Sequence, residues 1–344
     1  MHPPPPPFGS RSDWLAIDAG GANLKAADGR GFGRTVPFAL WREWRRLPKA
    51  LAEILAGHPA DRLAVTMTGE IADCFADRAA GVSQIVAACV EAAAGRPVFF
   101  YSLAGTLVEP HEATAKPLEV AASNWHALAR LAGSLVPAGR GLLLDIGSTT
   151  TDIVPLVEGR PAPQGWTDWS RMACGELLYQ GVERTPVAAL VRTLPHRGRR
   201  RPVASECFAT TRDAWLILGG LPERPGDHET ADGQPATRAA ARVRLARTLL
   251  VEPAAFDQTD AAAAADWIAE VQCRRLAAAI QRQAVTGNLP DAVVVAGHGS
   301  LLAERVISRL GLNRKVIPLP DRLGPELSRV GPAHALALIA WGQL

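Results

Sequence analysis

The sequence predicts an α/β protein made of two similar lobes. Apolar, β-branched runs alternate with helical segments, which is the pattern of a mostly parallel sheet with crossover helices. One strand–turn–strand pattern also occurs twice, at residues 17–25 and at residues 145–153. With 344 residues, the chain is too long for one typical domain and suits two lobes of roughly 150 residues each.

Each repeated segment is expected to be a hairpin whose tip can hold a phosphate. In each one an apolar strand runs into an aspartate, Asp18 or Asp145, and a turn of glycine and small or hydroxylic residues follows. Glycine lets backbone N–H groups approach phosphate oxygens, hydroxyls add donors, and an aspartate at a strand end suits Mg²⁺. The phosphate-binding candidates in the hairpins are Gly20, Gly21, Asn23, Lys25, Gly147, Ser148, Thr149 and Thr150. The metal-binding candidates are Asp18, Asp145 and Asp152.

Either hairpin alone could equally be a surface turn, and Lys25 could equally be a solvated strand residue. The repetition favours the functional interpretation. We therefore expect the two lobes to face one anionic ligand.

A third segment has the form of an anion site at a helix N-terminus. Residues 292–296 are a β-branched run, and a glycine-containing turn separates them from a helix expected at 301–310. A turn of this kind is a common nucleotide or phosphate site in α/β proteins, although it can also be an ordinary loop. The phosphate-binding candidates therefore include Gly297, His298, Gly299 and Ser300.

The other elements follow from hydrophobic patterning in chain order. In the first lobe we expect strands at 33–38, 63–67 and 98–101 and helices at 47–55, 82–94 and 123–135. In the second lobe we expect a polar insertion at about 166–253, an alanine-rich helix at 260–285, a strand at 316–317 and a helix at 332–341. The expected lobes are residues 13–137 and 138–344, with a linker at 137–141 and a disordered proline-rich tail at 1–12.

Composition excludes several classes of protein. The formal net charge of +3 is too small to indicate nucleic-acid binding, and the arginine-rich run at 197–201 is short enough to be a solvated loop. The five cysteines form no Cys-x-x-Cys pair, which disfavours a zinc or iron–sulfur site and fits a reducing cytosol. No apolar run is long enough to span a membrane. We expect a cytoplasmic protein that binds small molecules, does not bind nucleic acid or membranes, and could form a homo-oligomer.

The preferred general base is Glu70. It follows the strand expected at residues 63–67, at the carboxyl end where ligands bind in open α/β sheets. Asp73 is the alternative base, and capping of the following helix is the structural alternative for Glu70. The catalytic candidates are Glu70, Asp18 and Asp145. The candidates for the substrate pocket are Thr68, Gly69, Asp73, Asn124 and Trp125, although a tryptophan on a helix face is usually a core residue.

The chain resembles the superfamily of acetate and sugar kinases, actin and heat-shock ATPases, in which two ribonuclease-H-like lobes enclose a central cleft. In this comparison the Asp18 and Asp145 hairpins are similar to the two phosphate segments, and residues 297–300 are similar to the adenosine segment. Further motifs resemble the hydantoinase/oxoprolinase-like branch linked to tetrahydromethanopterin-dependent one-carbon transfer. These motifs are residues 66–75, 123–129, 145–153, 184–187 and 230–233.

The resemblance implies a transferase of methanofuran (methylofuran) biosynthesis. Such an enzyme condenses an aminomethylfuran diphosphate with the phenol of a tyramine or tyrosine unit, forms an ether and releases diphosphate. The cleft would then hold the leaving diphosphate, with Mg²⁺ as the cofactor. His298 departs from the superfamily pattern, because a small residue would better admit an adenine ring. The alternatives are an ATP-dependent kinase or hydantoinase/oxoprolinase-type amidohydrolase, and a chaperone-like reactivating ATPase.

Overall fold

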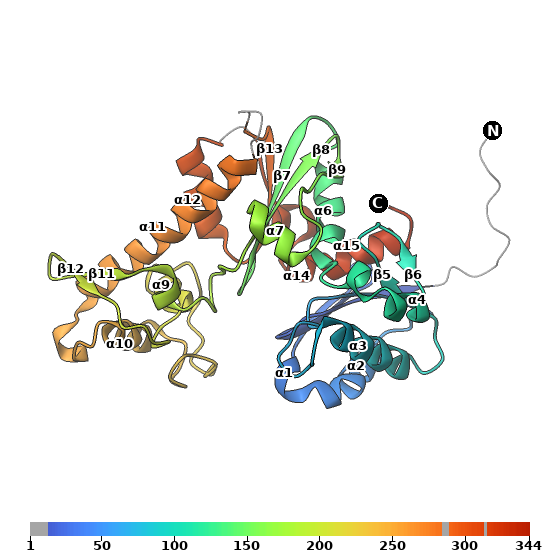
Figure 1. Ribbon diagram of the computed structural model, residues 1–344, viewed down its shortest axis with the longest axis horizontal. Helices are drawn as coiled ribbons and strands as arrows, with labels where there is room; N and C mark the ends of the chain where they lie inside the picture. Colours follow the sequence, from blue (N-terminus) through green and yellow to red (C-terminus); the bar gives the residue numbers. More distant parts are fainter. Residues whose placement is uncertain (1–12, 284–288, 313–314) are drawn as a thin grey trace. The chain divides into compact units, whose positions relative to one another are not determined.

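The computed structural model describes residues 13–283, 289–312 and 315–344, which form two compact units. Unit 1 combines the chain up to Leu131 with Leu323–Leu344, and unit 2 is Ala132–Arg322. Figure 1 shows the elements of both units. The predicted tail at residues 1–12 lies outside the described residues. No helix of the described segments is long and apolar enough to cross a membrane.

Unit 1 is built on a six-stranded mixed sheet with the order β3-β2-β1-β4-β5-β6. Strands β1 (Trp14–Ala19), β2 (Asn23–Ala27) and β3 (Gly33–Pro37) form an antiparallel meander, in which β2 pairs with both β1 and β3. Strands β4 (Arg62–Met67) and β5 (Val98–Tyr101) are parallel to β1, and β6 (Leu107–Val108) is an antiparallel edge. The expectation of a mostly parallel sheet was therefore wrong for this unit, because strands joined by short turns must pair antiparallel.

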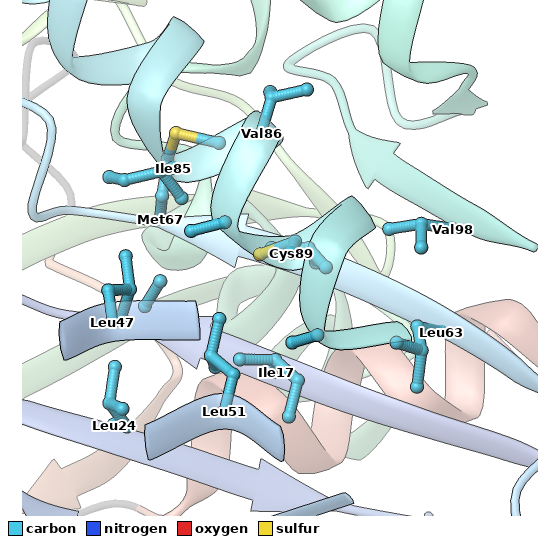
Figure 2. Close-up of a cluster of buried hydrophobic side chains, with 14 of the residues drawn as sticks. Ile17, Leu24, Leu47, Leu51, Leu63, Met67, Ile85, Val86, Cys89 and Val98 are labelled. Atoms are coloured by element: carbon cyan, nitrogen blue, oxygen red, sulfur yellow. The ribbon is translucent and has the colours of Figure 1, made fainter. Parts of the chain in front are cut away.

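Two helices cover a face of this sheet and close the core of unit 1. In α2 (Leu47–Leu55) the buried residues follow the spacing i, i+4, i+7 and i+8, which places them on one face of the helix. The longer α3 (Arg78–Ala93) adds a second buried face. Figure 2 shows side chains from β1, β2 and β4 meeting those of the two helices in one apolar cluster. The shorter helices of this part are α1 (Leu40–Glu43), η1 (Trp44–Arg46), α4 (Pro110–Ala115) and α5 (Pro117–Val120).

The C-terminal segment belongs to unit 1, whereas the sequence analysis placed residues 138–344 in one lobe. Helix α15 (Gly331–Ala340) packs against β1, β2 and β4, next to the short α14 (Pro325–Arg329). Trp341 Nε1 donates to the carbonyl of Asp28 at 2.9 Å. The unit boundary also falls inside α6 (Asn124–Leu135), not in the expected linker at 137–141. An apolar helix in a sequence does not identify the sheet that it covers.

Unit 2 repeats the strand arrangement of unit 1. Strands β7 (Arg140–Ile146) and β8 (Thr151–Val157) form an antiparallel hairpin, and β13 (Ala292–Gly297) and β14 (Val316–Pro318) continue the sheet parallel to β7. The short β9 (Arg160–Pro161) and β10 (Leu177–Leu178) both pair with β8. In each unit, the first strand of the hairpin pairs with the second strand on one side and with a parallel strand on the other side. Both units are therefore ribonuclease-H-like, as the sequence predicted.

The polar insertion of unit 2 is a folded part of the unit with its own apolar core. Its elements are α7 (Asp168–Cys174), α8 (Val187–Leu190), β11 (Thr193–His196), β12 (Arg199–Pro202), α9 (Thr211–Ile217), α10 (Arg238–Thr248) and η2 (Pro253–Ala255). Arg244, which has no exposed surface, makes ion pairs with Asp213 at 2.7 Å and Asp232 at 3.0 Å. The 230–233 motif therefore contributes a structural ion pair through Asp232.

One long helix connects the insertion to the sheet of unit 2 (Figure 1). The N-terminal half of α11 (Gln258–Gln283) buries Ala261, Ala265 and Ile268 in the core of the insertion. Its C-terminal half buries Leu276 and Ile280 in the core beneath the sheet, where α12 (Ser300–Leu310) also packs. The predicted end of this helix at residue 285 lies outside the described residues.

Candidate functional site

The turn of the first hairpin is closed by a contact that requires glycine. The amide of Gly20 donates to the carbonyl of Asn23 at 3.1 Å, and a Cβ on Gly20 would lie 2.8 Å from the same oxygen. In the strands below, Asp18 is paired in register with Lys25. Lys25 Nζ lies 3.7 Å from Asp18 Oδ2. The hairpin therefore holds one carboxylate and one ammonium group side by side, beneath a turn made of small residues.

Asp18 has the properties of a buried ligand carboxylate. It is only 2% exposed, and its Oδ1 has no hydrogen-bond partner among the described residues. Burial raises the pKa of the Asp18 carboxyl above its usual range, and the nearby Lys25 opposes this shift. A carboxylate oxygen that has lost its water and gained no donor fits a divalent cation, which would favour the charged form.

The loop after β4 rests on the end of β1, next to this hairpin. The amides of Thr68 and Gly69 both donate to the carbonyl of Ala19, at 3.1 and 3.0 Å. A Cβ on Gly69 would lie 2.4 Å from Leu40 Cδ2 and 3.2 Å from Ala19 O, so a larger residue there would displace the Leu40 side chain. Unit 1 therefore places Thr68 and Gly69 at the end of the strand that carries Asp18, beside the turn at Gly20.

Glu70 is enclosed and faces an arginine. The residue has no exposed surface, and Arg78 Nε lies 3.8 Å from Glu70 Oε1. The structural alternative, in which Glu70 caps the following helix, is wrong, because α3 begins at Arg78 and its N-cap is Asp77, which accepts from the amide of Ala80 at 2.7 Å. The carboxylate of Glu70 therefore does not reach the surface, and the guanidinium of Arg78 is a charged group beside it. The alternative base, Asp73, is exposed to solvent.

The start of α6 contacts β4, the strand that pairs with the strand of Asp18. Thr66 is the register partner of Asp18 on β4, and its hydroxyl lies 2.8 Å from the hydroxyl of Ser123. Asn124 begins α6 and is partly exposed. Trp125 is only 3% exposed and stacks edge-on against His126 at 5.5 Å, so it is a core residue and not a pocket wall.

The turn of the second hairpin is covered by the segment 181–184. The amide of Gly147 closes the turn by donating to Thr150 O at 2.9 Å. The amides of Glu183 and Arg184 then donate to Ser148 O at 3.1 and 2.9 Å. The cover thus fixes the Ser148 carbonyl, and the predicted Ser148, Thr149 and Thr150 lie in the turn with partly exposed side chains.

The third predicted segment packs directly on the second hairpin. The amide of His298 donates to Ile146 O at 3.0 Å, and a Cβ on Gly297 would lie 2.1 Å from that oxygen. Gly297 also has a φ of +80°, which favours glycine. The same Cβ would lie 2.8 Å from Asp145 Oδ1. Helix α12 starts at Ser300 without a side-chain cap, and the amide of its N-cap residue Gly299 donates to Ile146 O at 3.3 Å, so the helix begins beside the hairpin.

His298 lies at the surface beside an acidic group. Its side chain is 50% exposed, and its Nε2 lies 3.6 Å from Glu183 Oε1. Glu183 also pairs with Arg212, whose other amino group lies 3.0 Å from Asp227. His298 is therefore placed to gain a stabilising ion pair when it is protonated.

Asp152 does not fit the predicted role of metal ligand. Its Oδ1 is held by Arg171 Nη1 at 2.8 Å. Burial raises the pKa of Asp152, and the Arg171 guanidinium opposes that shift. Arg171 also donates to the carbonyl of Glu176, so this arginine fixes the edge of the sheet. Within the described segments, no group of three or more His, Cys, Asp or Glu side chains could hold a metal ion.

Two parts of the site were missed by the sequence reasoning. The cover at 181–184 overlaps a family motif at 184–187, but its position over the hairpin depends on a contact between distant residues. Arg78 opens a helix and has no motif around it. In the sequence, the cover is marked only by Gly181 followed by an apolar and an acidic residue, a pattern that could have suggested a turn with an acidic group.

A comparison with known protein families matches residues 61–331 to the model described as hydantoinase/oxoprolinase. The chain belongs to the hydantoinase/oxoprolinase family. This confirms the branch that the sequence motifs indicated, and the matched range includes the Glu70 loop, the second hairpin and the segment 297–300.

Two curated relatives of this hydantoinase/oxoprolinase-family protein carry the same name, (4-{4-[2-(gamma-L-glutamylamino)ethyl]phenoxymethyl}furan-2-yl)methanamine synthase. The protein from Methanocaldococcus jannaschii is 29% identical over 96% of this chain and 98% of its own length. The protein from Methanococcus vannielii is 27% identical over 59% of this chain and 91% of its own length. Among solved structures, a ROK-family glucokinase from Streptomyces griseus is 13% identical over 94% of this chain and 98% of its own, with a TM-score of 0.44.

Proposed function

We propose that this protein is an ether-forming synthase of methanofuran-type coenzyme biosynthesis. The observation that carries the proposal is the name shared by its two curated relatives, one of which aligns over nearly the whole chain. The hairpin turn of unit 2 supports it, because the turn carries hydroxyls and follows Ile146, whose carbonyl accepts from the amides of His298 and Gly299 just before α12. Such a site suits the diphosphate of an aminomethylfuran diphosphate.

The reaction needs charge stabilisation more than covalent help from the protein. A bond forms between the phenol oxygen and the furfuryl carbon, the bond from that carbon to diphosphate breaks with its electron pair, and the phenolic proton goes to solvent. The furan ring stabilises positive charge as the old bond loosens. Protein groups must therefore hold the diphosphate and align the phenol. Ser148, Thr149 and the start of α12 serve the first task.

Asp18 of the first hairpin and Asp145 of the second hairpin are each proposed as a Mg²⁺ ligand. Bound Mg²⁺ would neutralise charge on the departing diphosphate. Asp18 fits this role because its Oδ1 is buried and lacks a hydrogen-bond partner in the described chain. Asp145 stands at the carboxyl end of β7 beside Gly297, where a side chain at residue 297 would crowd it. Lys25 remains the counter-ion of Asp18 within the first hairpin.

The proposal is tested directly by product formation. Purified protein is incubated with Mg²⁺, the furan diphosphate and tyramine, tyrosine or γ-glutamyltyramine, and the mixture is analysed by mass spectrometry. We expect an ether product and one equivalent of diphosphate. Absence of ether from every acceptor, together with nucleotide turnover when ATP is added, would replace this function with an ATP-dependent one.

Ligand preference can be measured without the reaction. We expect Mg²⁺–diphosphate to raise the Tm more than Mg²⁺–ATP at the same concentration, because His298 stands where an adenine ring would need space. A ligand that binds only the folded state stabilises it by mass action. Thermal shift titrations make the comparison. A larger shift with ATP would favour the kinase-like or amidohydrolase alternative.

The Glu70–Arg78 pair provides a second test. Because Glu70 is enclosed and pairs with Arg78, we expect Glu70→Gln and Arg78→Gln each to slow ether formation by about 10-fold or more. The double variant should be little slower than the slower single variant, and diphosphate affinity should stay near wild type. Single-turnover kinetics measure these rates, with the exposed Asp73→Asn as the control. Loss of the acidic limb of the pH–rate profile in Glu70→Gln alone would instead identify Glu70 as the base.

A further inference from the structure

A groove of about 710 Å³ opens on the surface of unit 2, and nothing in the proposed diphosphate site uses it. One wall comes from α7 and β10 and includes Met172, Leu178 and Tyr179. The other wall is the exposed face of α11 with Arg275 and Arg282. The volume lies within the range of small-molecule sites, and the lining combines apolar surface with fixed cations.

The two arginines lie on one face of α11, and each contacts the chain beside the groove. They are seven residues apart in sequence, about 10 Å along the helix axis. Arg275 Nη2 donates to the carbonyl of Leu190 at 2.7 Å. The guanidinium of Arg282 packs against Gly175, with Nη2 3.1 Å from the position of a Cβ there. Each guanidinium has five N–H donors, so these contacts leave donors for a ligand.

The groove is continuous with the cover of the hairpin turn. Gln180 lines the groove, and its carbonyl accepts from the hydroxyl of Thr151 on β8 at 2.7 Å. The next residue, Gly181, packs on the backbone of Ser148, since a Cβ on Gly181 would lie 2.3 Å from Ser148 O. A molecule lying in the groove therefore has one end next to the proposed diphosphate site.

The opposite wall offers an aromatic ring and a thioether to such a molecule. Tyr179 is 53% exposed and Met172 is 50% exposed, which is unusual for large side chains of these types. Both suit the face or edge of an aromatic ring. The groove thus combines an exposed aromatic ring and thioether with two cations, next to the proposed phosphate-binding turn.

We propose that this groove binds the phenolic acceptor, and that Arg275 and Arg282 select an acceptor that carries a carboxylate. This inference rests on the proposed function and specifies its second substrate. The phenol ring lies against Tyr179 and Met172 with its oxygen toward the hairpin, while the carboxylate pairs with the guanidinium groups. Charge-assisted hydrogen bonds of this kind contribute about 1.5–3 kcal/mol, which corresponds to roughly 10-fold to 150-fold in affinity.

The test compares one carboxylated and one uncharged-tail acceptor, γ-glutamyltyramine and N-acetyltyramine. We expect Arg275→Gln and Arg282→Gln each to raise the KM for γ-glutamyltyramine at least about 10-fold while leaving the KM for N-acetyltyramine within twofold. Arg274→Gln is the matched control, because Arg274 is adjacent in sequence but pairs with Glu270 on another face of α11. It should change neither KM.

Titration calorimetry with the same two phenols separates this inference from the function it rests on. If wild-type protein makes no ether, the proposed function fails. Selective binding of γ-glutamyltyramine that depends on Arg275 and Arg282 would still support the groove as a binding site for a carboxylated phenol. Equal effects of the variants on both phenols, or an equal effect of Arg274→Gln, would overturn the inference. So would wild-type binding that is no tighter for the carboxylated phenol.

Discussion

Asp18→Asn is expected to abolish ether formation and, at the same time, to make the metal-free protein more stable. The change keeps the shape of the side chain and removes a buried charge that the proposed metal site needs, so activity should fall at least about 100-fold. The stability gain follows from the raised pKa of Asp18. A carboxyl whose pKa is higher in the folded chain favours folding below its unfolded pKa and loses that contribution as pH rises.

The sign of the expected change in Tm can be checked by its dependence on pH. At neutral pH, with chelator present, Asp18→Asn should raise the Tm by a few degrees, and the difference should shrink as pH falls toward 4. Asp13→Asn is the control, because Asp13 lies just before the same strand, pairs with Arg30 at 3.0 Å and is well exposed. An Asp18→Asn protein with normal activity would remove Asp18 from the metal site. A lower Tm at neutral pH would mean that the Lys25 pair outweighs the burial of the charge.

Gly181→Ala is expected to destroy the diphosphate site of unit 2. Its new methyl would lie 2.3 Å from Ser148 O and 2.5 Å from the amide of Thr149, so the turn or its cover must move. Forced overpacking of this kind costs about 1–3 kcal/mol of stability. A displacement near 1 Å at a binding turn costs about 100-fold in rate. We expect both losses, together with loss of the Tm shift caused by Mg²⁺–diphosphate.

Gly133→Ala separates the effect on the site from the effect on packing. A Cβ on Gly133 would lie 2.2 Å from Gly159 O, at the opposite end of β8 from Ser148. This variant should be destabilised to a similar degree but should keep the diphosphate-induced Tm shift. If both glycine variants lost that shift equally, the turn under Gly181 would not be the binding element.

The local parts of the site were accessible from the sequence. A strand followed by Asp and a glycine turn depends on neighbouring residues only, so both hairpins and the strand before Gly297 were predicted at nearly their observed bounds. The same holds for α2, whose apolar spacing is visible in the sequence. The strand order of both sheets agrees with the fold that the repeated hairpins suggested.

Contacts between distant residues were not accessible. The pairing of Asp152 with Arg171 removes a predicted metal ligand, and the two residues are separated by a strand and a helix start. The enclosure of Glu70 depends on Gly81, whose Cβ would lie 2.0 Å from Glu70 O. The packing of α15 on unit 1 is likewise determined by tertiary contacts, because an apolar helix can cover either sheet. The groove combines α7, β10 and α11, which no local pattern connects.

The continuity of α11 has a consequence for any shortened version of this chain. Because one uninterrupted helix completes two cores, the insertion is not a detachable module. Removing residues 166–253 would leave Ala261, Ala264, Ala265 and Ile268 without their partners on the first half of the helix. Such a stripe of newly bared apolar surface favours self-association. Viable deletions must therefore shorten the helix and the insertion together.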